Sequence, residues 1–106
     1  MARALITMPA TAKRGDVVEI RTLITHPMET GYRAGEDGAI QPRNLIRRFT
    51  CHYDDVLVFS ADLFPAVAAN PFIAFSTVAA ASGTLRFTWT GDKGFTQTET
   101  ASLAVT

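Results

Sequence analysis

The sequence predicts an all-β protein, an immunoglobulin-like two-sheet antiparallel sandwich of about seven strands. Two observations predict this class. Thr, Val, Ile and Phe dominate while helix signals are nearly absent, and these residue types suit a pleated, half-buried surface. Apolar and polar residues also alternate with period two in short runs that are separated by turn residues. Because 106 residues suit one domain, we expect a single domain over residues 1–106.

Two strands are expected near the N-terminus. Residues 3–8 form the first, which Pro9 ends because proline has no N–H for a sheet ladder. Residues 17–25 form the second, in which Val and Ile alternate with charged side chains until Pro27. Residues 26–43 then form a long connection, and loops of this length are often functional.

The middle of the chain predicts a hairpin. Strand 45–53 is joined by the turn Asp54-Asp55 to strand 56–61. One face of the first strand carries Phe49, Cys51 and Tyr53. The alternation stops after residue 61, and the Ala-rich residues 66–69 are compatible with one helical turn.

Three strands complete the sandwich, over residues 72–78, 84–90 and 95–105. The second of them points Leu85, Phe87 and Trp89 inward, and we expect Trp89 to fill the core. Gly91-Asp92-Lys93-Gly94 predicts a tight hairpin turn. In the last strand Gln97 and Glu99 are in phase with Leu103 and Val105, which predicts a bulge or an edge position.

Composition excludes several classes of function. Ten basic and ten acidic side chains cancel, whereas a general nucleic-acid binder needs a basic excess, so we expect no nucleic acid partner. No apolar run is long enough to span a membrane, so we expect no membrane association. One Cys and two His leave little for a metal centre, and we expect no metal and no cofactor. No nucleophile elbow or phosphate loop is present, which argues against an enzyme.

Cys51 and His52 are adjacent, but neighbours on a strand point to opposite faces and cannot form a thiolate–imidazolium pair. We expect Cys51 to be an inert core thiol, with a reactive or partner-bonded thiol as the alternative, and His52 to lie on the surface.

Three segments are candidates for binding. The loop His26-Pro27-Met28-Glu29-Thr30-Gly31 either packs Met28 against the sandwich edge or forms a docking loop. The arginines Arg33, Arg43, Arg47 and Arg48 make one end positive, which is either a solvated face or a surface that steers an anionic ligand or acidic partner; we select Arg33, Arg47 and Arg48 for that role. An apolar patch is a partner interface if Phe64 is exposed and core if it is buried. Its residues are Leu63, Phe64, Pro65, Asn70 and Pro71.

The run from Gly15 to Gly31, Gly-Asp-Val-Val-Glu-Ile-Arg-Thr-Leu-Ile-Thr-His-Pro-Met-Glu-Thr-Gly, resembles the signature of the SoxZ family. Its members are the small subunits of the SoxYZ sulfur-carrier complex of thiosulfate oxidation. Three further pieces agree with the resemblance, which covers about residues 6–105. They are Phe49-Thr50-Cys51 with Tyr53, Phe59-Ser60-Ala61-Asp62-Leu63 leading to Asn70-Pro71, and Phe87-Thr88-Trp89-Thr90.

The resemblance implies a non-catalytic subunit of a heterodimer. It would scaffold a SoxY-like partner whose C-terminal Gly-Gly-Cys-Gly-Gly arm carries covalent sulfur intermediates, while sulfur-oxidising enzymes of the same pathway dock transiently. It implies a periplasmic location by co-export with a signal-bearing partner, since we recognise no signal peptide in this sequence. Self-association of the isolated chain is left open.

Two other interpretations stand beside this one. A stand-alone ligand-binding or adhesion-type β-sandwich module predicts a monomer without a dedicated partner. A small enzyme that uses Cys51 and a His predicts a thiol that reacts in the folded state.

Overall fold

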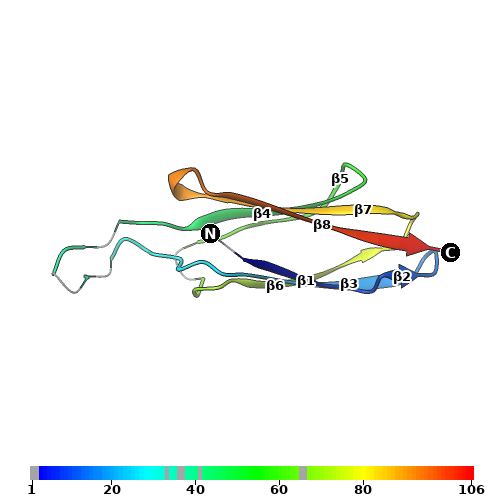
Figure 1. Cartoon of the computed structure of the whole chain (residues 1–106), viewed down its shortest axis with the longest axis horizontal. Helices are drawn as coiled ribbons and strands as arrows, with labels where there is room; N and C mark the ends of the chain where they lie inside the picture. The colour runs from blue at the N-terminus through cyan, green and yellow to red at the C-terminus, as the bar shows by residue number, and fades with distance from the viewer. Residues whose placement is uncertain (1–2, 33, 36–37, 41, 65–66) are drawn as a thin grey trace.

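Two β-sheets pack face to face in the computed structural model, which describes residues 3–32, 34–35, 38–40, 42–64 and 67–106 (Figure 1). One sheet has the strand order β1-β3-β6 and the other the order β2-β8-β7-β4-β5. The bounds of the first sheet are β1 Ala4–Thr7, β3 Val17–Ile24 and β6 Phe72–Val78. The bounds of the second are β2 Thr11–Ala12, β8 Thr96–Val105, β7 Gly83–Gly91, β4 Ile46–Tyr53 and β5 Val56–Asp62. The two-sheet, all-β fold is confirmed.

All neighbouring strands pair antiparallel except β2, which pairs parallel with Ala104 and Val105 of β8. The molecule extends 57 Å along its long axis and 21 and 19 Å across it. In Figure 1 the described residues of the connection between β3 and β4 reach beyond the sandwich at the left.

Aromatic side chains join the two layers. Trp89 and Phe49 are fully buried, and their ring centroids lie 5.1 Å apart. Phe49 also meets Phe75 of the other sheet at 5.9 Å. Burial of each large apolar side chain stabilises the fold by about 1.5–3 kcal/mol, so this cluster is a major part of the core. The expectation that Trp89 fills the core is confirmed.

The hairpin between β4 and β5 has the predicted turn. Asp54 and Asp55 adopt φ values of 46° and 68°, as a two-residue hairpin turn of the mirror-image type requires. Asp tolerates this left-handed region, and the Asp54 side chain accepts a hydrogen bond from the N–H of Thr84 at 2.9 Å.

The turn between β7 and β8 is a tight hairpin, as predicted. Thr90 pairs with Thr96, the N–H of Phe95 donates to the carbonyl oxygen of Asp92 at 3.1 Å, and Lys93 and Gly94 have φ values of 59° and 70°.

Other local predictions were wrong. Residues 67–69 contain no helical turn, and residue 66 lies outside the described residues. His52 is half-buried and its Nδ1 is inaccessible, so it is not a plain surface side chain. The register of β4 against β5 shifts between Cys51 and His52, an irregularity that the alternation does not reveal.

Gln97 and Glu99 lie on the same face of β8 as Leu103 and Val105, and no bulge is needed to explain this. The register of β8 against β7 is unbroken, and among the described residues β2 covers only the C-terminal end of β8. The rest of β8 is therefore a sheet edge, as one of the two alternatives predicted. No helix in the part of the chain that the structure describes is long and apolar enough to cross a membrane.

Candidate functional site

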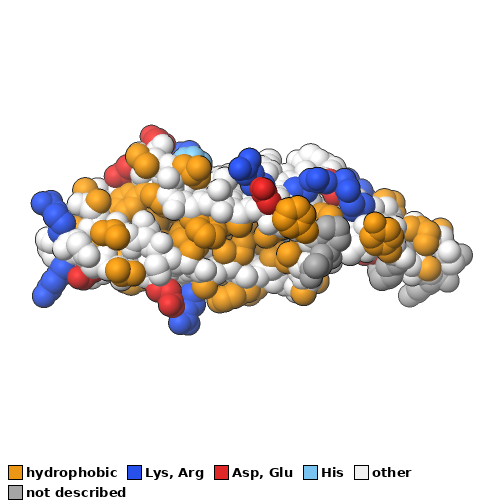
Figure 2. Space-filling view, turned by 180° about the vertical axis from the view of Figure 1, so that it is seen from behind, with side chains coloured by type: hydrophobic (Ala, Val, Ile, Leu, Met, Phe, Trp, Pro, Cys, Tyr) orange, Lys and Arg blue, Asp and Glu red, His pale blue; other side chains and the backbone are white. Residues whose placement is uncertain are grey.

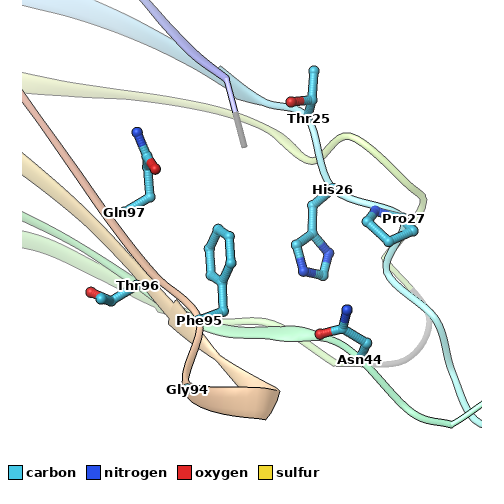
Figure 3. Close-up of a pocket in the computed structure, with 8 residues that line it drawn as sticks. All are labelled: Thr25, His26, Pro27, Asn44, Gly94, Phe95, Thr96 and Gln97. Atoms are coloured by element: carbon cyan, nitrogen blue, oxygen red, sulfur yellow. The ribbon is translucent and has the colours of Figure 1, made fainter. Parts of the chain in front are cut away.

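An open pocket of about 540 Å³ lies where the chain leaves β3 and enters β8 (Figure 3). The imidazole of His26 points into it, between Phe95 and Asn44. The Phe95 ring meets the imidazole edge to face, with centroids 5.0 Å apart. The complete lining is Thr25, His26, Pro27, Asn44, Gly94, Phe95, Thr96 and Gln97. None of these side chains other than His26 is ionisable, so the pocket is polar and close to neutral.

His26 is held by three hydrogen bonds. Its backbone N–H donates to Oδ1 of Asn70 at 2.9 Å, and its carbonyl oxygen accepts from the N–H of Asn70 at 2.8 Å. Its Nδ1 accepts from the N–H of Met28 at 3.0 Å, which places the ring proton of a neutral imidazole on Nε2. No hydrogen bond of Nε2 is found among the described residues. Burial lowers the pKa of His26 and the negative charge of Asp92 opposes this, so the pocket receives a neutral N–H donor.

Of the two interpretations of residues 26–31, the packing of Met28 is observed, and the docking role stays a prediction. Met28 is only 4% exposed, with φ 50°, and its sulfur accepts a hydrogen bond from the N–H of Ile46 at 3.3 Å. Pro27 is exposed, while Glu29, Thr30 and Gly31 are half-buried. The segment is therefore a packed framework with a narrow accessible strip.

Asp92 anchors this end of the molecule, a role that the sequence pattern did not predict. Its carboxylate accepts from the N–H of Leu45 at 3.1 Å and from Arg43 Nε at 3.1 Å, and it lies 3.5 Å from Arg47 Nη1. Burial works to raise the pKa of Asp92, but the hydrogen bonds and the two guanidinium charges outweigh it and lower the pKa. The one signal in the sequence was an acidic residue inside a Gly-bounded turn.

The arginines selected for steering are partly neutralised. Arg48 Nε lies 3.6 Å from Asp62, and Arg47 shares Asp92 with Arg43. Both side chains remain more than half exposed and so stay accessible to a partner. Arg33 lies outside the described residues.

The apolar segment selected as an interface is divided by the fold. Phe64 is 64% exposed, and Leu63 is half-buried. Pro71 is buried, and the side chain of Asn70 is engaged with His26. Pro65 lies outside the described residues. Of this set, Phe64 is therefore the large apolar side chain available to a partner.

Cys51 lies in the core, as predicted. It is fully buried, and burial raises the pKa of its thiol to about 12. Within the described ranges, no group of three or more His, Cys, Asp or Glu side chains is placed to hold a metal ion.

Solved structures with the same fold come from different kinds of protein. A superoxide reductase (neelaredoxin) from Ignicoccus hospitalis is similar with a TM-score of 0.76 and 16% identity, over 97% of this chain and 80% of that protein. The sulfur carrier protein SoxY from Chlorobium limicola f thiosulfatophilum is similar with a TM-score of 0.67 and 16% identity, over 97% of this chain and 78% of that one. At such low identity these similarities establish the fold alone. No curated protein sequence matches the chain.

The sequence match to a family is more specific. The family model described as "Sulphur oxidation protein SoxZ" matches residues 6–102, which is nearly the whole chain. The match includes the His26–Gly31 segment and all strands from β2 to β7. The chain therefore belongs to the SoxZ family.

Proposed function

We propose that this chain is the non-catalytic subunit of a periplasmic sulfur-carrier heterodimer of thiosulfate oxidation. It scaffolds a SoxY-like partner whose C-terminal Gly-Gly-Cys-Gly-Gly arm carries the covalent sulfur intermediates. The family match over residues 6–102 is the observation that carries this proposal. Co-export with a signal-bearing partner is the proposed route to the periplasm.

The state of Cys51 supports this division of labour. A carrier thiol must reach solvent and ionise in order to form a covalent adduct. Cys51 is fully buried, and its pKa is raised to about 12, so it meets neither requirement. The partner then carries out the carrier chemistry, and this chain supplies the surfaces that bind the partner and the enzymes.

The loop root, residues 26–31, is the proposed docking surface for the sulfur-oxidising enzymes. Its rigid framework presents Pro27 beside the pocket, while Nε2–H of His26 offers a hydrogen bond without a charge. Arg47 and Arg48 lie toward the same end of β4 and add positive charge for acidic surfaces or anionic adducts. A neutral donor in a pocket, together with exposed cations at the start of β4, suits brief, repeated contacts.

Co-expression with a SoxY-like subunit tests the proposal. A tagged form of this chain should co-purify with that subunit. Light scattering should then give the mass of a 1:1 complex. After incubation with thiosulfate and the loading enzymes, intact mass spectrometry should find sulfur-containing mass on the partner's cysteine and none on Cys51. Recovery of this chain alone as a monomer would favour the stand-alone binding module, and added mass on Cys51 would favour a reactive-thiol enzyme.

A further inference from the structure

Strand β5 is an unusual sheet edge because it is apolar on both faces. Val56, Leu57, Val58 and Phe59 follow one another without a polar residue. Val56 is 63% exposed and Leu57 is 52% exposed, although neighbours on a strand point to opposite sides. Such continuous apolar runs are typical of strands that are covered on both faces, and exposed apolar edges invite pairing with another chain.

One side of β5 has no strand beside it. The strand pairs with β4 from Val56 to Asp62, and it is the last strand of its sheet in the described part of the chain. The outward-directed N–H and C=O groups of this seven-residue strand therefore have no neighbouring strand in the described part of the chain. Natural sheets protect such edges with charge, proline or a covering segment, and the first four residues of β5 carry neither charge nor proline.

The neighbouring edge of the other sheet extends this apolar surface. Phe59 of β5 stacks on Phe75 of β6, with ring centroids 4.3 Å apart. Where β5 begins and β6 ends, a pocket of about 290 Å³ is lined mainly by small apolar side chains, among them Val56, Val58 and Val78. Figure 2 shows hydrophobic side chains along the middle of this side of the molecule. The β5 edge and this pocket form one apolar surface.

An ion pair marks each end of this surface. Asp54 and Asp55 occupy the turn that begins β5, and Asp55 is paired with Arg86 at 3.0 Å. Arg48 pairs with Asp62 at the other end, beside Arg47. In Figure 2 acidic side chains lie at the upper left and basic ones gather toward the upper right. The ion pairs bound the uncharged stretch from Val56 to Ala61, which is the part of β5 that a partner strand can cover.

We infer that a second domain of the same two-sheet fold joins here, by adding its own edge strand antiparallel to β5. The five-stranded sheet then continues into the partner, and an apolar side chain of the partner fills the pocket lined by Val56, Val58 and Val78. Two domains of like fold related by a pseudo-two-fold axis bring equivalent edges together in the antiparallel sense. The SoxY structure has this fold, and the inference rests on the proposed function for the identity of the partner.

A matched pair of double variants tests the site. The Val56→Lys, Leu57→Lys variant places two charges on β5, and the Leu5→Lys, Val17→Lys variant places two charges on similarly exposed side chains of β1 and β3. Both variants should keep the wild-type circular dichroism. We expect the β5 variant to bind the SoxY-like subunit at least roughly tenfold more weakly, and the control to stay within about twofold. Wild-type affinity of the folded β5 variant would overturn the inference.

Amide hydrogen exchange of the wild-type complex gives a second reading that needs no variant. Amides of Val56–Asp62 should gain protection on binding, and protection confined to other strands would overturn the assignment. If the wild-type chain does not bind the SoxY-like subunit at all, the proposed function fails first. A homodimer of the wild-type chain that the β5 variant abolishes, with no binding of the SoxY-like subunit, would make a second copy the occupant and overturn the inference about the partner.

Discussion

The backbone N–H of Met28 donates a hydrogen bond to Nδ1 of His26 at 3.0 Å, inside the protein. The bond closes a tight turn in which Met28 has φ 50°, and it fixes the proton of the neutral imidazole on Nε2. One interaction thus sets both the path of the loop root and the chemistry that His26 presents to the pocket.

Replacing His26 should separate these two roles. His26→Phe keeps an aromatic ring against Phe95 but leaves the buried N–H of Met28 without an acceptor, at a cost of about 1–3 kcal/mol in the free energy of unfolding. His26→Asn offers Oδ1 as a replacement acceptor and should lose less. Urea denaturation of both variants measures the difference, and equal losses would show that the hydrogen bond contributes little.

Stability should fall when the solution is acidified below pH 6.5. Burial lowers the pKa of His26 from its ordinary value of 6.5, so the unfolded chain binds this proton more readily than the folded chain does. The contribution of the neutral imidazole is fully present above pH 6.5 and is lost as the pH falls through the lowered pKa. Urea midpoints between about pH 7.5 and pH 5 measure the slope, and the slope should shrink in His26→Asn. An unchanged slope in that variant would assign the effect to other groups.

Cys51 should not react with iodoacetamide in the folded protein at about pH 8. Its thiol is fully buried and its pKa is raised to about 12, so both access and thiolate are lacking. The same cysteine should be alkylated completely in urea, which serves as the control. Intact mass spectrometry reads both states, and rapid alkylation without urea would revive the reactive-thiol interpretation.

Two glycine substitutions should differ in their cost. A Cβ at Gly91 would strike the carbonyl oxygen of Leu45 and approach Cα of Ile46 to 2.8 Å, and this backbone is tied down by Asp92. We expect Gly91→Ala to lower the free energy of unfolding by about 3 kcal/mol. For Gly83→Ala the three atoms nearest to the new Cβ all belong to the Asp54 carboxylate, which can rotate away at the loss of one hydrogen bond, about 1 kcal/mol. Equal thermal shifts of the two variants would show that the backbone at Leu45 yields as easily as the Asp54 side chain.

Reversing charge at Arg47 and Arg48 tests the steering proposal. In the complex with a SoxY-like subunit, Arg47→Glu, Arg48→Glu should slow adduct loading and weaken its dependence on salt. Arg21→Glu is the control, because it removes an equally exposed arginine from the other sheet. Loading rates measured over a range of salt concentrations decide the question, and unchanged rates and salt dependence in the double variant would refute the proposal.

The alternation of residue types was enough to predict all the long strands. Inward positions such as Phe87 and Trp89 repeat with period two, and burial follows that period directly. Strand β2 was missed because two residues, Thr11 and Ala12, are too few to show a period, and β8 alone orders them.

The site was harder to predict than the strands. His26 and Met28 lie in a loop, where burial depends on contacts with distant residues such as Asn70 and Ile46. The anchoring role of Asp92 depends in the same way on Leu45, which is 47 positions away. The local pattern of residue types does not predict contacts between distant residues. It could therefore identify the segment 26–31 but not its geometry.

The elongated outline of the molecule affects how its assembly state must be measured. The radius of gyration is 16.1 Å, whereas a compact chain of this length is expected to have about 13 Å. A particle of this shape experiences more friction than a sphere of equal mass and leaves a gel-filtration column early. Calibration against globular standards would assign the monomer too large a mass and could present it as a dimer. Light scattering or sedimentation equilibrium, which report mass independently of shape, are therefore the methods that can count the subunits of this protein.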